Sequence, residues 1–430
     1  MSLVNLRMIE VPLSVALPST LIMTIVGGLI CFFAGARTRA MAPVMAAFAV
    51  HVSVGLGNYF ASGVTLDALK YHGFAVQYAQ VLATGGSTAE LPTEFSSGRE
   101  GWIYVLGVLY FIFGSVPPVG LVFNAMLIGV AVGIIASTSR LAGWPESARI
   151  AAWVAVIAPP IVYWPSLLGR EASIFLLLSI MALSLSLFIA KRAVLAAATL
   201  WGSALLGLVI RPQIALVAMF GILLAAMALA VLEPGRLRVT LLFISPALVA
   251  LPLGLLRGMG DYLTKFFTGL GNIRTELSMT ANSKTGVSLD GFDTPSGVII
   301  GTLRDLPRGI LGPLIWEWTP GYWQLAIDAS FWAVVVLTCY FAIRWGSYRV
   351  RMLSFVLPAL SILFLSTAIM GNWGILVRMR TQALPFLLIV MAQGFYLWRR
   401  RHLELKRRAL PVHPLVQPVA LRSGPKDIRE

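Results

Sequence analysis

Long apolar stretches, separated by short polar connections, run through almost the whole chain. They fall at 11–34, 41–60, 117–138, 147–165, 171–190, 193–210, 212–232, 239–257, 326–343, 352–370 and 380–397. Each is close to the length of about 20 residues that an α-helix needs to cross the hydrocarbon core of a bilayer. The pattern therefore predicts an all-α, polytopic membrane protein with about 11 transmembrane helices.

Two apolar stretches need separate interpretation. In the first run, residues 34–36 (Ala-Gly-Ala) resemble a signal-peptide cleavage site. The run is too long for a signal peptide, however, and its positive charges, Arg37 and Arg39, follow it instead of preceding it. We therefore interpret it as a transmembrane helix. The stretch 101–114 is apolar but short, and we predict an interfacial or re-entrant helix there, ahead of the span that begins near Pro117.

The composition excludes a soluble globular protein. Hydrophobic residues make up 58% of the chain and charged residues 12%, whereas a soluble domain carries about 25% charged residues. Cys31 and Cys339 lie inside apolar stretches and the four histidines are scattered, which argues against a disulfide framework or a metal cluster. No glycine-rich phosphate loop is present. The sequence indicates no certain cofactor and leaves a divalent metal open.

The net charge of +15 follows the predicted membrane topology. If the N-terminus and residues 61–116 lie outside, the inside segments hold 20 of the 33 Lys and Arg residues but only 5 of the 18 Asp and Glu residues. The whole positive excess is then inside, as the positive-inside rule requires. We therefore predict a multi-pass protein of the cytoplasmic (inner) membrane, with its N-terminus outside, its C-terminus inside and no nucleic-acid partner.

The same layout predicts the domain organisation. Residues 1–397 form a single integral membrane domain with two long outer loops, 61–116 and 258–325. The tryptophan-rich end of the second loop, 309–323, is expected to lie on the membrane surface. Residues 398–430 form a basic tail that we predict to be disordered in the cytoplasm, touching anionic membrane lipid at most.

The first candidate site is the outer-loop segment Asp67–His72, which follows the second span. It places Asp67, Lys70, Tyr71 and His72 together where the chain leaves the membrane. A carboxylate close to the bilayer can act as a general base, or hold a metal or a sugar hydroxyl. The alternative is a solvated loop acid, with Thr65 or Asp67 capping the next helix.

Two further candidates stand at predicted outer turns. Arg170 and Glu171 directly precede an apolar run, where Arg170 suits a phosphate and Glu171 suits the positive end of a helix dipole. The alternative is that the two residues simply pair with each other. Arg211 lies in a tight outer turn against the positive-inside trend, so it either faces an anionic ligand or reaches to lipid headgroups.

A fourth candidate is Gly371-Asn372-Trp373-Gly374 followed by Arg378 and Arg380. Glycines allow close backbone approach, and arginine binds phosphate through two parallel hydrogen bonds. Because positions two apart point to different faces of a helix, we expect one of the two arginines to face the interior. A fifth, weaker candidate is the group Glu90, Glu94, Arg99 and Glu100 in the first outer loop.

These segments resemble a known class of membrane enzymes. An apolar span, an outer loop with Asp67 in a D-x-x-x-Y-H context, a surface helix and a second span are similar to the C-type (GT-C) membrane glycosyltransferases. Segments 101–138, 164–171, 306–318 and 371–380 also resemble the multi-spanning glycosyltransferases and Wzy-type polymerases of bacterial polysaccharide clusters. The first resemblance implies that Asp67 is the catalytic acid of the first outer loop. The extra helix at 11–34 departs from that pattern, and the late loop lacks the histidine expected of an O-antigen ligase.

The predicted function is a membrane glycosyltransferase or glycan polymerase of surface or exopolysaccharide synthesis. It would use a polyprenyl-phosphate-linked sugar at the outer face, alongside other polysaccharide-assembly proteins. Arginines would bind the phosphate and a carboxylate would deprotonate the acceptor hydroxyl. The alternatives are a transporter or flippase for lipid-linked sugar, and a non-catalytic membrane subunit. The predicted catalytic residues are Asp67 and Glu171, and the predicted phosphate- or substrate-binding residues are Arg170, Arg211, Arg378, Arg380, His72, Tyr71 and Asn372. Of these, Asp67, Arg170, Arg211 and either Arg378 or Arg380 are expected to converge on one outward cavity.

Overall fold

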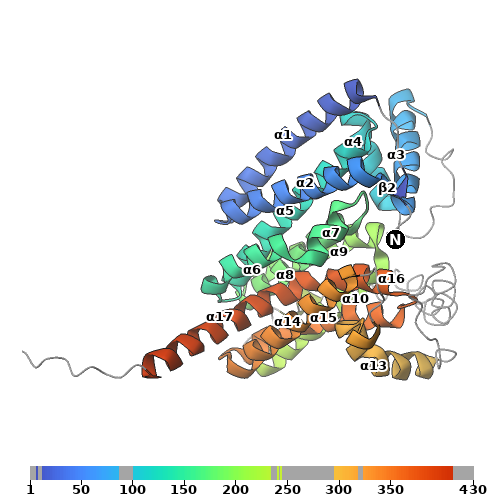
Figure 1. The fold of residues 1–430 in the computed structure, drawn as a ribbon. Coiled ribbons are helices and arrows are strands. Elements are labelled where there is room, and N and C mark those ends of the chain that lie inside the picture. Colours follow the sequence, from blue (N-terminus) through green and yellow to red (C-terminus); the bar gives the residue numbers. More distant parts are fainter. Residues whose placement is uncertain are drawn as a thin grey trace, which may run out of the picture.

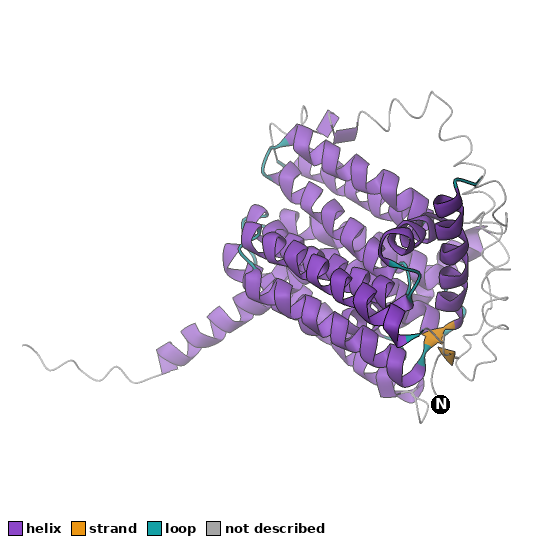
Figure 2. Ribbon diagram, turned by 90° about the horizontal axis from the view of Figure 1, so that it is seen from above, coloured by secondary structure: helices purple, strands orange, loops and turns teal. Residues whose placement is uncertain are grey.

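The computed structural model describes residues 6–7, 12–86, 100–233, 240–241, 243–244, 295–317 and 323–409. Helices make up nearly all of this part of the chain (Figures 1 and 2). The strands in these ranges are β1 (Leu6–Arg7) and β2 (Val64–Thr65), two residues each, which pair antiparallel. The predicted all-α membrane fold is confirmed.

Nine helices within the described ranges are long and apolar enough to cross a membrane. Eight are single helices, and the ninth joins α17 (Leu384–Ala409) to the short α16 (Trp373–Arg380) and η5 (Thr381–Ala383) ahead of it. The eight are α1 (Leu13–Arg37), α2 (Met41–Ser62), α5 (Pro117–Leu141), α8 (Glu171–Ile189), α9 (Ala193–Ile210), α10 (Pro212–Leu232), α14 (Trp323–Trp345) and α15 (Arg349–Ala368).

The predicted span 147–165 is broken into two parts. It consists of α6 (Pro145–Ile157), then α7 (Pro159–Tyr163) and the 3-10 turn η3 (Trp164–Ser166), with a bend of 56° between the two parts. Proline disfavours the helical conformation of the residue before it, and Ala158 is accordingly extended, with φ −61° and ψ 117°. The predicted span 239–257 lies outside the described residues except for 240–241 and 243–244, which are helical.

The helices α5 and α8 lie in the middle of the bundle. The most apolar windows of both are 83% buried, compared with 17% for α1. Small residues let neighbouring helices come close, since a side chain at Gly129 of α5 would lie 2.6 Å from the sulfur of Cys31. Packing of this kind is what holds membrane helices together, because lipid provides no hydrophobic driving force between them.

The first predicted outer loop is largely helical. α3 (Leu66–Thr84) and α4 (Glu100–Phe113) pack against each other at one end of the bundle (Figure 1). α4 has 14 residues and is followed directly by Gly114, whose φ of 101° suits glycine. The short helix predicted at 101–114 is therefore confirmed as α4. Glu90, Glu94 and Arg99 lie outside the described residues.

The second predicted outer loop, 258–325, is described only in part. It contains α13 (Pro295–Leu311) and the 3-10 turn η4 (Ile315–Glu317), whereas 258–294 lies outside the described residues. Trp316 is 79% exposed and Trp323, at the start of α14, is 64% exposed. Exposed tryptophans of this kind are typical of the headgroup level of a bilayer.

The predicted disordered tail was expected to begin at residue 398, but the described chain is helical beyond this point. α17 continues to Ala409, and an ion pair of 3.0 Å joins Arg400 to Glu404 one turn later. The cause is that a change from apolar to charged residues does not end a helix, and no proline occurs between residue 398 and Pro411. Residues 410–430 lie outside the described part.

The helix ends that carry Arg37, Arg140 and Arg349, which were predicted to lie inside, are at the end of the bundle opposite α3 and α16 (Figure 1). There Arg140 donates to the carbonyl of Thr38, and Arg351 pairs with Glu233 at 3.4 Å. The candidate residues Asp67, Glu171, Arg211 and Arg378 lie at the α3 and α16 end.

Candidate functional site

Four charged side chains from distant parts of the chain meet at the α3 and α16 end. Arg378 Nε donates to Glu171 Oε1 at 2.5 Å, and Arg378 Nη1 donates to Asp67 Oδ2 at 3.1 Å. Arg211 Nη1 lies 3.5 Å from the same Glu171 oxygen. We call Asp67, Arg378, Glu171 and Arg211 the rim charge cluster. The sequence predicted each residue separately. The structure brings these four side chains together, while their chemical role stays a prediction.

The start of α3 positions Asp67. The Thr65 hydroxyl caps the helix by accepting from the Ala68 backbone N–H at 3.1 Å, so Asp67 is free for another role in the first turn. Its side chain is 52% exposed, although Arg378 holds one oxygen. The segment Asp67–His72 was expected to be a loop and is helical instead, because the cap at Thr65 begins the helix just before it.

Glu171 is the first residue of α8 and is held by a well-anchored turn. Asn124, inside α5, donates from Nδ2 to the carbonyls of Leu167 and Gly169 at 2.8 and 3.0 Å. Gly169 is tight, because an added Cβ there would collide with Glu171 Oε2. Sequence reasoning missed Asn124 and Gly169, although a lone amide within an apolar span was a signal for Asn124.

The same turn is tied to α2 by a second polar contact. Ser166 Oγ and His51 Nδ1 lie 2.8 Å apart, and both side chains are buried. A Cβ at Gly55, also on α2, would lie 2.9 Å from the Ser166 carbonyl oxygen. The backbone that presents Glu171 is therefore fixed from two helices.

Arg170 and Arg211 stand beside Glu171 in different ways. Arg170 Nη1 donates to the Ile210 carbonyl at 3.1 Å, which ties the end of α9 to the start of α8. Arg211 is 7% exposed and donates towards the Met379 sulfur. It lies next to Glu171 but does not line the cavity described below. Burial, and then the neighbouring Arg170 cation, lowers the pKa of Arg211 to about 9, which leaves it charged at neutral pH.

A cavity of about 260 Å³ opens beside the cluster. Its walls include Asp67, Glu171 and Arg378, together with Tyr71 and Asn372 from the predicted set. Asn372 also begins α16, because its Oδ1 accepts from the Ile375 N–H at 3.0 Å. This cap directs the first turn of α16, and hence Arg378 one turn later, towards the cavity.

Arg380 does not join the cluster, although it was among the predicted binding residues, so Arg378 is the one of the two arginines that faces the cavity. It is fully buried, pairs with Asp328 and donates from Nη1 to the carbonyls of Ile310 and Gly312 at 3.1 and 2.7 Å. Its guanidinium also lies 5.4 Å from the Trp332 ring centre. Two positions from Arg378 on a helix, it faces the opposite way and joins α13 to α14 and α16.

His72 also turns away from the cavity. Its Nδ1 lies 2.9 Å from the hydroxyl of Tyr110 on α4, so it contributes to the packing of α3 against α4. Burial lowers the pKa of His72 to about 4. The histidine is therefore neutral at ordinary pH and is not placed to bind a phosphate in the cavity.

The sequence left open whether the protein binds a divalent metal. Within the described ranges, no three His, Cys, Asp or Glu side chains are grouped to hold a metal ion. In the cavity, the Arg378 guanidinium is the cation that contacts both Asp67 and Glu171.

Comparison with known proteins yields no family model, no curated protein and no solved structure that matches the chain. The function is therefore argued from the rim charge cluster and its cavity.

Proposed function

We propose that the protein is a membrane-embedded glycosyltransferase or glycan polymerase that uses a polyprenyl-phosphate-linked sugar. One observation carries this proposal: Arg378 spans two carboxylates of different exposure beside a cavity at the end of the bundle. A half-exposed acid next to a positioned guanidinium fits a reaction in which a hydroxyl loses a proton while a phosphate leaves.

Asp67 is the proposed general base. Its side chain is 52% exposed, so an acceptor hydroxyl can reach the carboxylate from the cavity. As the acceptor oxygen bonds to the anomeric carbon of the donor sugar, its proton passes to Asp67. The bond from that carbon to the phosphate oxygen breaks, and its electron pair stays on the phosphate.

Arg378 is the proposed phosphate ligand. Its guanidinium lines the cavity and can exchange its contact with Asp67 for one with the leaving phosphate. Glu171 is 5% exposed and orients Arg378 through Nε instead of acting as a second base. Arg170 and Arg211 lie next to Glu171 and bring further positive charge to this side of the cavity.

The charge distribution supports an outer-face site. Described Lys and Arg residues concentrate at helix ends opposite α3 and α16, such as the last turns of α1 and α5 and the start of α15, and such ends face the cytoplasm. We infer that the acceptor and the lipid-linked donor meet at the outer face of the cytoplasmic membrane. Synthesis of a surface or exopolysaccharide with other assembly proteins is the proposed context.

The test is to measure surface glycan and its lipid-linked precursor in cells that carry Asp67→Asn or Arg378→Ala. We expect transfer to fall by about 10²- to 10⁴-fold for Asp67→Asn, with the precursor accumulating. The matched controls, Asp305→Asn and Arg304→Ala, alter an ion pair of 3.2 Å that does not line the cavity. Normal glycan in both cavity variants would contradict the proposal.

A further inference from the structure

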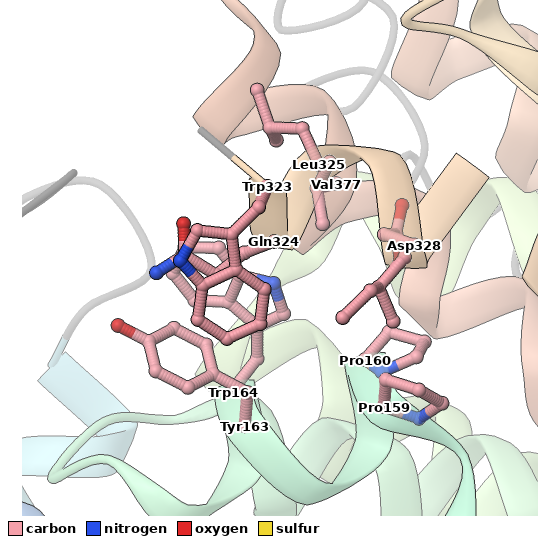
Figure 3. A pocket seen from close by; sticks show the side chains of 10 residues that line it. Pro159, Pro160, Tyr163, Trp164, Trp323, Gln324, Leu325, Asp328 and Val377 are labelled. Atoms are coloured by element: carbon pink, nitrogen blue, oxygen red, sulfur yellow. The ribbon is translucent and has the colours of Figure 1, made fainter. Parts of the chain in front are cut away.

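A second cavity, of about 190 Å³, is shown in Figure 3. It is formed between the broken span and the start of α14. Trp164 lines both cavities, and Val377 in its wall is the residue before Arg378. A ligand here is therefore adjacent to the rim charge cluster.

One side of this second cavity is aromatic. Tyr163 and Trp164 form an edge-to-face pair, with ring centres 5.1 Å apart and planes at 81°. Figure 3 shows these rings and that of Trp323 together, with Asp328, Pro159 and Pro160 on the other side. Trp323 is 64% exposed, so it has ring surface left for a ligand. Flat ring faces suit the C–H face of a sugar ring.

The other side carries a buried acceptor atom. Asp328 is 4% exposed; its Oδ2 pairs with Arg380, whereas its Oδ1 is buried with no hydrogen-bond partner among the described residues. A buried carboxylate oxygen in this state is costly unless a donor reaches it. A ligand hydroxyl that reaches Asp328, which lines the cavity, would supply that donor. An isoprenoid chain carries no hydroxyl and leaves the oxygen unsatisfied.

We propose that this cavity is the subsite for one pyranose ring of the acceptor glycan, an inference that rests on the proposed transferase function. The ring packs its C–H face on Trp164 and Trp323 and donates a hydroxyl to Asp328. Gln324, which also lines the cavity, offers a further amide partner at the rim. Since Trp164 separates the two cavities, the next hydroxyl of the acceptor points towards Asp67.

The test is saturation-transfer NMR on the full-length protein in lipid nanodiscs. The probes are the methyl pyranosides of glucose, galactose, mannose and N-acetylglucosamine. We expect transfer to the ring protons of at least one probe, with affinity about fivefold weaker in Trp323→Ala. Trp316→Ala is the matched control, because Trp316 is 79% exposed and does not line the cavity. It is expected to bind as the unaltered protein does.

Two results would overturn the subsite. One is that no probe binds, or that binding is the same in Trp323→Ala. The other is that geranylgeranyl phosphate displaces the bound pyranoside in the unaltered protein, which would make the cavity a lipid-chain site. Asp67→Asn separates this inference from the proposed function: pyranoside binding is expected to survive in that variant although transfer is lost. Retained transfer in Asp67→Asn would contradict the transferase mechanism alone.

Discussion

Glu171 and Arg378, 207 positions apart in the chain, are joined by a hydrogen bond of 2.5 Å between Oε1 and Nε. Glu171 is buried at the start of α8 and Arg378 lies in the last turn of α16. The same glutamate oxygen is 3.5 Å from Arg211 Nη1. One buried carboxylate thus orients two guanidinium groups.

Replacing Glu171 with Gln should destabilise the fold. The change leaves Arg211, which is 7% exposed, without its carboxylate partner, and breaking a buried pair costs about 3 kcal/mol. Thermal unfolding of the purified protein in detergent measures the effect. The control is Glu404→Gln, where the ion pair with Arg400 is more than half exposed and is worth less than about 0.5 kcal/mol. Equal stability loss in both variants would contradict the arrangement.

Gly169→Ala should impair transfer more than stability. The added Cβ collides with Glu171 Oε2, so the carboxylate must turn and Arg378 loses its orientation. A misplacement of about 1 Å at a reaction centre costs about 100-fold in rate. The assay is precursor turnover in membranes. Gly73→Ala on α3 is the control, because a Cβ there meets no atom within 4 Å and activity should be unchanged.

Asn124→Leu should loosen the turn that carries Glu171. The substitution removes the two hydrogen bonds to the carbonyls of Leu167 and Gly169, and each buried acceptor left without a donor costs about 1–3 kcal/mol. We expect a lower unfolding temperature in detergent. Ser184→Ala, which removes only a contact to a carbonyl within α8, should cost less than about 1 kcal/mol. A neutral Asn124→Leu would show that the turn is held by other contacts.

Arg378→Lys should retain folding and lose transfer. Lysine keeps the charge, but it cannot contact Asp67 and Glu171 from two sides of a planar group as Arg378 does. We expect a rate loss of about tenfold or more, because oriented hydrogen bonds to the leaving phosphate are reduced. Transfer at the normal rate, with the variant present at the normal level in membranes, would contradict the proposed phosphate contact.

Acid should weaken the packing of α3 on α4 through His72. Burial lowers the pKa of His72 to about 4 in the folded protein, whereas an unperturbed histidine titrates near about 6.5. Between these values the unfolded chain binds more protons, so this stabilising contribution is present above about pH 6.5 and is lost as the pH falls towards about 4. We expect a loss on the order of 2 kcal/mol.

The measurement for His72 is stability against pH, compared with His72→Phe. The variant lacks the titrating group and also the contact with Tyr110. Its curve should therefore be lower near neutral pH and flatter between about pH 4 and 6.5. Parallel curves for the two proteins would show that His72 does not report on this packing.

The fold was predictable because the bilayer imposes one strong constraint. Every polar backbone group inside lipid must be satisfied within its own helix, so apolar length alone identifies spans such as 117–138 and 171–190. The structure corrects the boundaries where polar residues continue a helix. The extension of α17 to Ala409 and the helix that begins after Thr65 are two such cases.

The residue types at the candidate site were also visible in the chain, because charges at span ends are costly and few. Their grouping was not. Arg378 and Arg380 are the same residue type, two positions apart, yet Arg378 faces the cavity and Arg380 is fully buried against Asp328. That choice depends on the rotation of α16, which its cap at Asn372 and its packing decide.

The sequence by itself determined a helical membrane protein, its charged end residues and their expected side of the bilayer. Only the tertiary structure decided that Asp67, Arg378, Glu171 and Arg211 form one cluster, and that Asn124 and Gly169 support it. The physical reason is the distance along the chain over which each effect acts. Hydrophobicity and charge bias act between one segment and its surrounding solvent, whereas an ion pair between residues 207 positions apart depends on how the helices pack.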